Sequence, residues 1–242
     1  MLGALELTGR SRTHVRELAE PQCMLHPDAL VALLALRTAA RGAGIELLPV
    51  SSFRDFDAQR AIWNGKYRGE RPLLDRDNRP LVAAQLLPAE RVAAILCWSA
   101  LPGASRHHWG SDFDVIDRNA LPAGERVQLL DSEYAASGRY ARLSAWLAAH
   151  AADYGFFHPY DRDRGGVLPE PWHLSYAPVA QPALAALTPA LLAAALAGAD
   201  IEGWEVIAPR LPEYHERYVA AVAAVPGAAL AARALSRAAR PA

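Results

Sequence analysis

The chain has 242 residues, 52% of them apolar, with 25 basic and 26 acidic side chains and a formal net charge of −1. This length allows one large domain or two small ones, and the near-neutral charge gives no argument for binding nucleic acid or an anionic membrane surface. Cys23 and Cys97 lie far apart, so they form neither a disulfide framework nor a thiolate zinc site. The longest stretch without charged side chains, 171–199, contains four prolines and is interpreted as outside any membrane. The first residues lack the apolar segment of a signal peptide, so we expect a cytoplasmic protein.

Hydrophobic periodicity predicts helices and strands interspersed along the chain. In chain order we expect a helix at 27–42, a strand at 45–53, helices at 56–67 and 88–98, a strand at 111–116, a helix at 140–152, a strand around 156–157 and a strand at 173–176. Thr188 and Pro189 suit the N-cap and first position of an alanine-rich helix. The charged, proline-containing stretch 68–82 is interpreted as a solvated connection rather than a functional lid.

This pattern predicts an α+β fold in which a small sheet is packed by helices. We divide the chain into an N-terminal segment (1–25), a central domain (26–181) and a helical C-terminal extension (182–242). The last boundary is placed where the composition shifts towards alanine.

The segment 105–114 holds a first group of residues that could carry chemistry. His107 and Asp114 are seven residues apart, one in a loop and one in a strand, and Gly110 lets the chain turn between them. Such a pair can converge on a metal ion, although the pair taken alone favours polar surface residues in a turn. Asp112 and Asp114 share one face of the strand, so they repel each other unless a positive group lies between them.

A second group is Glu170 and His173, three residues apart at the start of a strand. Together with His107 and Asp114 it provides three metal ligands and one spare carboxylate. Three protein ligands and a general base are typical of a catalytic rather than a structural zinc site.

Arg54, at the end of an apolar strand, is poorly explained by packing. A guanidinium in this place can stabilise an oxyanion or bind a carboxylate in bidentate fashion. A salt bridge with Asp55 or Asp57 is the alternative.

Three motifs occur in order: S-x-F-R-x-x-x-x-Q, P-G-x-S-x-H-x-x-G-x-x-x-D and E-x-W-H. In this respect the segment 26–180 resembles the zinc D-Ala-D-Ala carboxypeptidases and dipeptidases of the vancomycin-resistance type, whose superfamily also holds lysostaphin-like and hedgehog-like domains. The resemblance implies a small antiparallel sheet flanked by helices. It also implies one zinc ion per chain, held by His107, Asp114 and His173.

The same resemblance implies that Glu170 is the catalytic base and that Arg54 stabilises the transition state. Residues predicted to contact the substrate are Ser105, Gln59, Arg106 and Trp109. The first two follow from the family motif; the others flank the ligands in the sequence.

Asp112 departs from the family pattern, because many members carry alanine two residues before the aspartate ligand. We expect its carboxylate to accept a hydrogen bond from a ligand imidazole or to lie near the substrate. Trp172 is predicted to hold the ligand geometry by packing, and His108 to be structural. His158 is interpreted as a loop residue.

The implied function is removal of the terminal D-Ala from peptidoglycan stem peptides. A cytoplasmic enzyme would meet free muropeptides, which favours an L,D-carboxypeptidase that trims tetrapeptides during recycling. The alternatives are a D,D-carboxypeptidase, a D-Ala-D-Ala dipeptidase, an endolysin-type peptidase and a non-catalytic zinc-binding module. Glu170 argues against the last, because a binding site has no use for a base. The sequence leaves the oligomeric state open.

Overall fold

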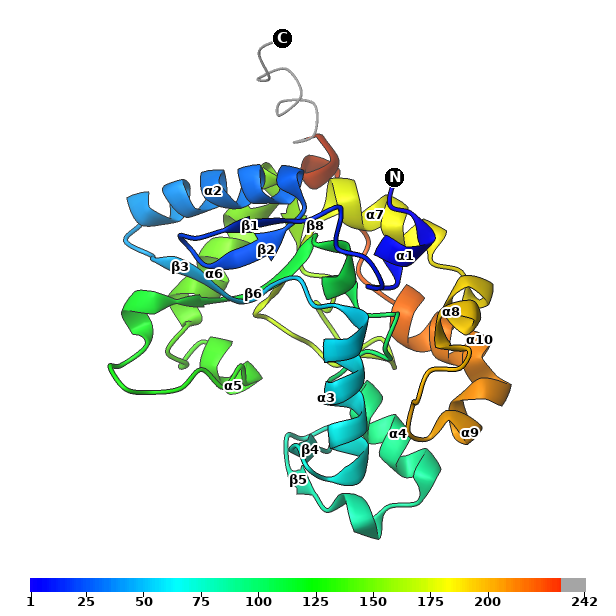
Figure 1. Ribbon diagram of the computed structural model, residues 1–242. Helices are drawn as coiled ribbons and strands as arrows, with labels where there is room; N and C mark the ends of the chain where they lie inside the picture. The colour runs from blue at the N-terminus through cyan, green and yellow to red at the C-terminus, as the bar shows by residue number, and fades with distance from the viewer. Residues whose placement is uncertain (232–242) are drawn as a thin grey trace.

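The computed structural model describes residues 1–231, and its centre is a four-stranded antiparallel sheet (Figure 1). The strand order is β3 (Leu47–Ser51), β6 (Asp112–Asp117), β8 (His173–Tyr176) and β7 (Phe156–Phe157). The strands lie where the sequence predicted them, and helices flank the sheet. The predicted α+β class is confirmed.

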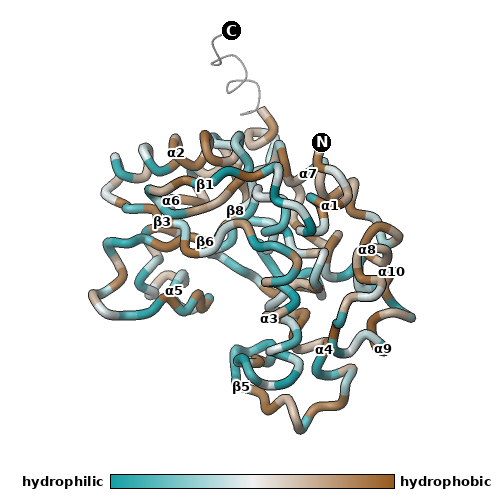
Figure 2. The backbone as a smooth tube through the Cα atoms, in the orientation of Figure 1, coloured by the Kyte–Doolittle hydropathy of each residue, from teal (hydrophilic) through white to brown (hydrophobic). Residues whose placement is uncertain are grey.

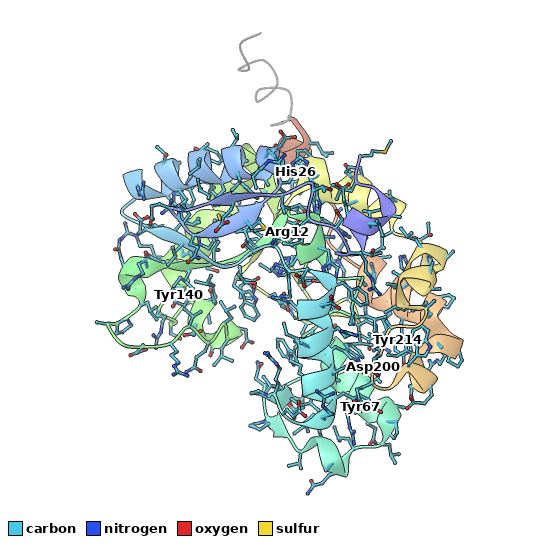
Figure 3. The ribbon with its side chains drawn as sticks, in the orientation of Figure 1. Arg12, His26, Tyr67, Tyr140, Asp200 and Tyr214 are labelled. Atoms are coloured by element: carbon cyan, nitrogen blue, oxygen red, sulfur yellow. The ribbon has the colours of Figure 1, made fainter. Side chains whose placement is uncertain are left out.

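One hydrophobic core, here called the sheet core, packs α2 (Pro27–Gly42) and α6 (Ala141–His150) against the sheet. It includes Leu33 of α2 and Leu147 of α6, which meet apolar side chains of β6 and β8. Tyr140 belongs to this core, whereas Tyr67 belongs to a second core that is described next. Figure 3 shows the two tyrosines in different parts of the molecule.

A second core, the helical core, joins α3 (Phe56–Arg68) and α4 (Pro88–Leu96) to helices from the end of the chain. Those helices are α7 (Ala177–Ala186), α8 (Pro189–Leu196), α9 (Trp204–Ile207) and α10 (Leu211–His215). Trp63 of α3 is fully buried there, and its Nε1 donates a hydrogen bond to the carbonyl of Glu202 at 3.0 Å. The described part of the C-terminal extension therefore shares a core with the central domain; residues 232–242 of the predicted extension lie outside the described residues.

Local sequence explains where the main helices begin and end. The carboxylate of Asp55 caps α3 by accepting a hydrogen bond from the amide of Ala58, and the helix ends at Gly69, whose φ of 78° suits glycine. As predicted, Thr188 caps α8, with Pro189 in its first position. Helix α8 is hydrophobic along most of its length, whereas the β4–β5 region is largely hydrophilic (Figure 2).

Several short elements were not predicted. The N-terminal segment forms α1 (Ala4–Leu7) and a hairpin of β1 (Arg16–Leu18) and β2 (Cys23–Leu25), and the stretch 68–82 contains a hairpin of β4 (Leu73–Leu74) and β5 (Pro80–Leu81). Helix α5 (Asp131–Tyr134) follows β6, and short 3₁₀ or π turns lie at Ala83–Gln85, Arg106–Trp109, Arg118–Ala120, Ala151–Tyr154, Ala208–Arg210 and Glu216–Ala220. Elements of two to five residues are too short for a periodic pattern to show.

Within residues 1–231, no single helix is long and apolar enough to cross a membrane. Helices α7 and α8 reach the required length and composition only as a pair, and they meet at 80°.

Candidate active site

Strand pairing brings two of the predicted metal ligands together. Asp114 of β6 lies opposite His173 of β8 in the sheet register, and Oδ1 of Asp114 is 3.2 Å from Nδ1 of His173. His107 comes from the 3₁₀ turn before β6, with Nε2 3.7 Å from Oδ2 of Asp114. Phe113 and Val115 point into the sheet core, so the alternation of β6 places Asp114 on the opposite face. All three side chains are buried, and their donor atoms lie within 4.8 Å of one another.

The hydrogen bonds of both imidazoles direct one lone pair each towards this centre. Nδ1 of His107 donates to the carbonyl of Ser52 at 2.9 Å, which leaves Nε2 free to bind a metal. Nε2 of His173 donates to Oδ2 of Asp112 at 3.0 Å, which leaves Nδ1 free. Oδ1 of Asp114 is buried and accepts no conventional hydrogen bond. Two imidazole nitrogens and one carboxylate form a donor set that fits zinc.

The charges around the ligands also fit a cation. Burial disfavours a charged His173, but the nearby carboxylates of Asp112, Asp114 and Glu170 outweigh burial and raise its pKa well above the usual value. The centre therefore attracts positive charge to Nδ1, where a metal ion would compete with a proton. Burial lowers the pKa of His107 to about 3, so this imidazole is neutral, as a ligand must be.

Asp112 supports the ligands from behind. It is fully buried, and besides His173 it binds Nε of Arg106 at 2.7 Å and Oγ of Ser175 at 3.0 Å. Burial would raise the pKa of Asp112, but the Arg106 and His173 partners outweigh burial and lower it. Arg106 and His173 are thus the positive groups that allow Asp112 and Asp114 to share a strand face.

Arg106 lines the cleft, but most of its side chain is engaged by the protein itself. Its side chain is 3% exposed, and Nη2 donates to Oγ of Ser175 at 2.6 Å. Nε and Nη2 hold Asp112 and Ser175, which gives Arg106 a positioning role, whereas Nη1 is buried without a hydrogen-bond partner. The contact of Arg106 with substrate stays a prediction.

Glu170 lies beside the ligands, as the motif predicted. Its Oε2 is 3.4 Å from Nδ1 of His173, and it lines the same cleft. The amide of Glu170 donates to the carbonyl of Tyr160, and the amide of His173 donates to the carbonyl of Glu170, so a tight turn fixes both side chains. Burial raises the pKa of Glu170, which suits a carboxylate that accepts a proton.

Arg54 points into the cleft from the end of β3. Nη1 donates to Oε1 of Gln59 at 2.8 Å, and Nη2 donates to Oγ of Ser51 at 3.1 Å. The salt bridge weighed as an alternative is absent among the described residues, since Asp55 caps α3 and Asp57 pairs with Arg60.

Two residues predicted to contact the substrate do not line the cleft. Gln59 is fully buried, and its Nε2 donates to the carbonyl of Ala100 at 2.6 Å, so it orients Arg54 instead of touching a ligand. Trp109 is also fully buried, with Nε1 bonded to the carbonyl of Leu7 at 3.1 Å. Neither burial nor these backbone partners can be read from the local sequence.

The cleft has a volume of about 300 Å³, and the ligands, Glu170, Arg54, Ser105 and Trp172 line it. His108 is structural, as predicted: it is fully buried and bonds to the carbonyl of Arg54. His158 donates to the carbonyl of His173 at 3.0 Å and is not one of the three clustered ligands.

One wall of the cleft was not predicted from the sequence. Leu74 and Asn78, from the stretch interpreted as a solvated connection, line it together with 128–130. Nδ2 of Asn78 donates to Oδ1 of Asp131 at 3.1 Å, which links the β4–β5 turn to the start of α5. The stretch 68–82 is mostly exposed, as a solvated connection should be, but two of its residues also form part of the cleft wall.

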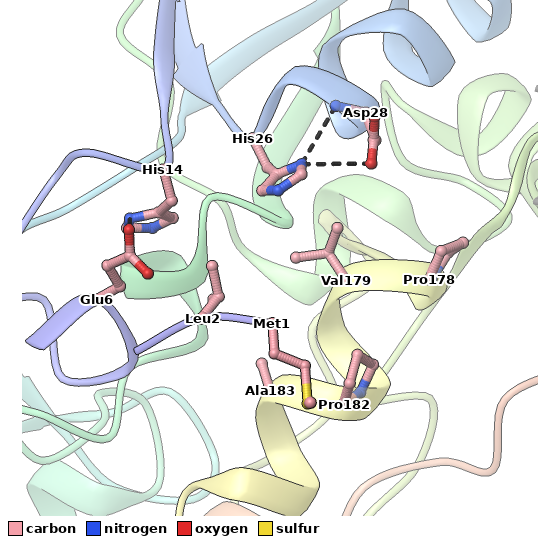
Figure 4. A pocket seen from close by; sticks show the side chains of 10 residues that line it. All are labelled: Met1, Leu2, Glu6, His14, His26, Asp28, Pro178, Val179, Pro182 and Ala183. Atoms are coloured by element: carbon pink, nitrogen blue, oxygen red, sulfur yellow. Dashed lines mark hydrogen bonds and ion pairs between the residues drawn. The ribbon is translucent and has the colours of Figure 1, made fainter. Parts of the chain in front are cut away.

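A second cavity of about 380 Å³ lies between the N-terminal residues and α7 (Figure 4). His14 and His26 line it, but each faces a different acid: Glu6 is 3.8 Å from His14, and Asp28 is 3.9 Å from His26. Their donor atoms do not form a cluster of the kind seen at His107, within the residues that the structure describes.

Residues 22–179 match the family model described as VanY, D-alanyl-D-alanine carboxypeptidase. The chain belongs to this family. The family assignment confirms the predicted enzyme class, and residues 22–179 contain the ligands, Glu170 and Arg54.

Two Haemophilus influenzae proteins of undescribed function are relatives of this VanY-family chain. One is 34% identical over 121 residues, which is 49% of this chain and 92% of the relative; the other is 42% identical over 98 residues, which is 39% and 67%. The fold is similar to that of VanYB solved with D-alanine-D-alanine, with a TM-score of 0.50 and 20% identity over 80% of this chain and 87% of that one.

A structure of a vancomycin-resistance D,D-pentapeptidase VanY variant in complex with Zn(II) covers 67% of this chain and 78% of that one, with 23% identity and a TM-score of 0.49.

Proposed function

We propose that the chain is a zinc carboxypeptidase that removes the terminal D-Ala from free peptidoglycan stem peptides. The observation that carries the proposal is the placement of Glu170 beside His107, Asp114 and His173 at the floor of an open cleft. A metal site that serves only structure has no need for this buried carboxylate or for the opening.

The residues of the cleft divide the work of peptide hydrolysis. Zinc bound by His107, Asp114 and His173 would supply Lewis acidity and an acidified water. Glu170 takes a proton from the attacking water and passes it to the nitrogen of the departing D-Ala. Arg54, held by Gln59 and Ser51, donates hydrogen bonds to the carbonyl oxygen as it gains negative charge.

We further propose that tetrapeptides are the preferred substrates and that the bond from an L-centre to D-Ala is cleaved. The cleft is larger than a D-Ala-D-Ala dipeptide needs, and Asn78 and Gln128 give its outer wall polar groups. A long polar side chain at the third position of a stem peptide suits this wall better than a methyl group does. We propose the cytoplasm, where free muropeptides are recycled, as the place of action.

Mass spectrometry of tri-, tetra- and pentapeptide muropeptides after incubation with the zinc-loaded protein tests the proposal. We expect the tetrapeptide to lose one D-Ala and the tripeptide to stay intact, with Glu170→Gln protein as the inactive control. Shortening of the pentapeptide alone would indicate a D,D-carboxypeptidase, and cleavage of free D-Ala-D-Ala alone would indicate a dipeptidase. Internal fragments from intact sacculi would indicate an endopeptidase.

A further inference from the structure

Helix α3 places a cation, Lys66, at the cleft, and no sequence motif predicted it. Gln59, Ile62 and Lys66 are spaced by three and four residues, so they follow one face of the helix. Gln59 holds Arg54, whereas Ile62 and Lys66 line the cleft directly. The side chain of Lys66 is half-buried, and its Nζ donates to Oγ of Ser99 at 2.7 Å.

This ammonium has no carboxylate partner within ion-pair distance among residues 1–231. An ammonium offers three protons, and Ser99 accepts only one of them. The charges that act on Lys66 are Glu170, which attracts it, and Arg54 and Arg71, which repel it. Burial is the largest influence and lowers its pKa to about 8, so Lys66 carries a charge at neutral pH while part of its hydrogen-bonding capacity is unused.

The α3 side of the cleft lacks an anion to match its cations. Of its acidic side chains, Asp114 and Glu170 face the metal centre, and Arg106 is already neutralised by Asp112. Arg54 and Lys66 remain on the α3 side, where the guanidinium of Arg54 disfavours the charge of Lys66. A ligand that brings one negative charge to this side would relieve the repulsion and complete the hydrogen bonds of Lys66.

We propose that Lys66, with Ser99 beside it, binds the terminal carboxylate of the peptide and so restricts the enzyme to chain ends. This inference rests on the proposed function and names the residue that gives it its specificity. The terminal carboxylate lies one residue beyond the scissile bond, so its partner must be near the groups that act on that bond. Lys66 meets this condition, since it lines the same cleft as Glu170 and Arg54.

The test compares a stem tetrapeptide with its C-terminal amide in steady-state kinetics. For the unchanged protein we expect kcat/KM to be about ten- to hundredfold higher for the tetrapeptide with a free carboxylate (the acid) than for the amide, because the amide leaves the ammonium of Lys66 without its partner. Lys66→Met should raise KM for the acid until acid and amide are cleaved alike, with little change in kcat. Arg60→Met is the matched control: it lies on the same helix, pairs with Asp57 and should keep the preference.

A pH series separates an anchoring charge from a structural role. The preference for the acid should fall in the unchanged protein as the pH rises through about 8, the pKa of Lys66. It should persist to higher pH in Lys66→Arg, since a guanidinium stays protonated.

Three outcomes would overturn the anchor. A preference for the acid that survives in Lys66→Met, with zinc content and circular dichroism intact, would assign recognition to another group. Equal cleavage of acid and amide by the unchanged protein would remove the selectivity itself. Cleavage of neither peptide would overturn the proposed function, and the anchor with it.

Discussion

His173 donates a hydrogen bond from Nε2 to Oδ2 of the fully buried Asp112, 3.0 Å away. The same oxygen accepts from Nε of Arg106 at 2.7 Å, so the carboxylate cannot turn away from the imidazole. Asp112 therefore sets both the ring orientation of His173 and the nitrogen that faces the metal.

We expect Asp112→Asn to weaken zinc binding by about ten- to hundredfold, because the neutral amide makes His173 a poorer ligand. Competition with a chromophoric chelator measures the change. Asp117→Asn, at the other end of β6, is the control and should bind zinc normally. An unchanged zinc affinity in Asp112→Asn would show that Arg106 and packing alone orient the ring.

His107→Ala, Asp114→Ala and His173→Ala should each lose most of the one zinc expected per chain, since each removes one of three protein ligands. Elemental analysis after dialysis is the measurement, and His150→Ala, outside the cleft, is the control. Full zinc in all three variants would refute the ligand set.

Glu170→Gln should keep its zinc and its fold but lose kcat by about two orders of magnitude or more, because the amide cannot accept the proton of the attacking water. Turnover of a tetrapeptide, compared at equal zinc content, is the measurement. A variant that works at nearly the original rate would remove Glu170 from the role of base.

Arg54 and Gln59 should act as one unit. Arg54→Lys is expected to lower kcat by about ten- to hundredfold, since an ammonium cannot bond Gln59, Ser51 and the substrate with the geometry of a guanidinium. Gln59→Leu should lower kcat as well, yet add little in the Arg54→Lys background. Additive losses in the double variant would mean that Gln59 contributes by a separate route.

The lowered pKa of Lys66 should also make the free energy of unfolding depend on pH. Its pKa of about 8 in the folded protein lies below the value of about 10.4 expected for an unfolded lysine. Between these values the unfolded chain binds more protons, so the contribution of Lys66 to the free energy of unfolding must become more favourable as the pH rises. Urea unfolding of the unchanged protein and of Lys66→Met, each at pH 7.5 and 9.5, measures the difference between their free energies of unfolding. A difference that is the same at both pH values would mean that the pKa of Lys66 is normal.

Local sequence predicted the elements and chemistry that depend on nearby residues. Helix α2 has the expected bounds, because Pro27 starts it and the glycines after residue 41 end it. The ligand set was found because zinc chemistry restricts residue types. The burial of Gln59 and Trp109 could not be predicted, since it and carbonyl partners such as that of Leu7 come from distant segments. The position of Lys66 at the cleft could not be predicted from the sequence, because a lysine on a helix is ordinarily a solvated charge.

The packing of α3 shows that the shortest stable fragment of this protein must extend beyond the family motifs. A gene fragment that ends at residue 181 would encode every motif of the family, yet Trp63 would lose its carbonyl partner at Glu202 and Asn64 its partner at Asp200. Helix α3 carries Gln59 and Lys66, so the loss of packing behind the helix would also loosen the side chains that it places at the cleft. Engineered truncations and domain fusions of this enzyme should therefore retain the chain at least through Val222, which packs against the helical core.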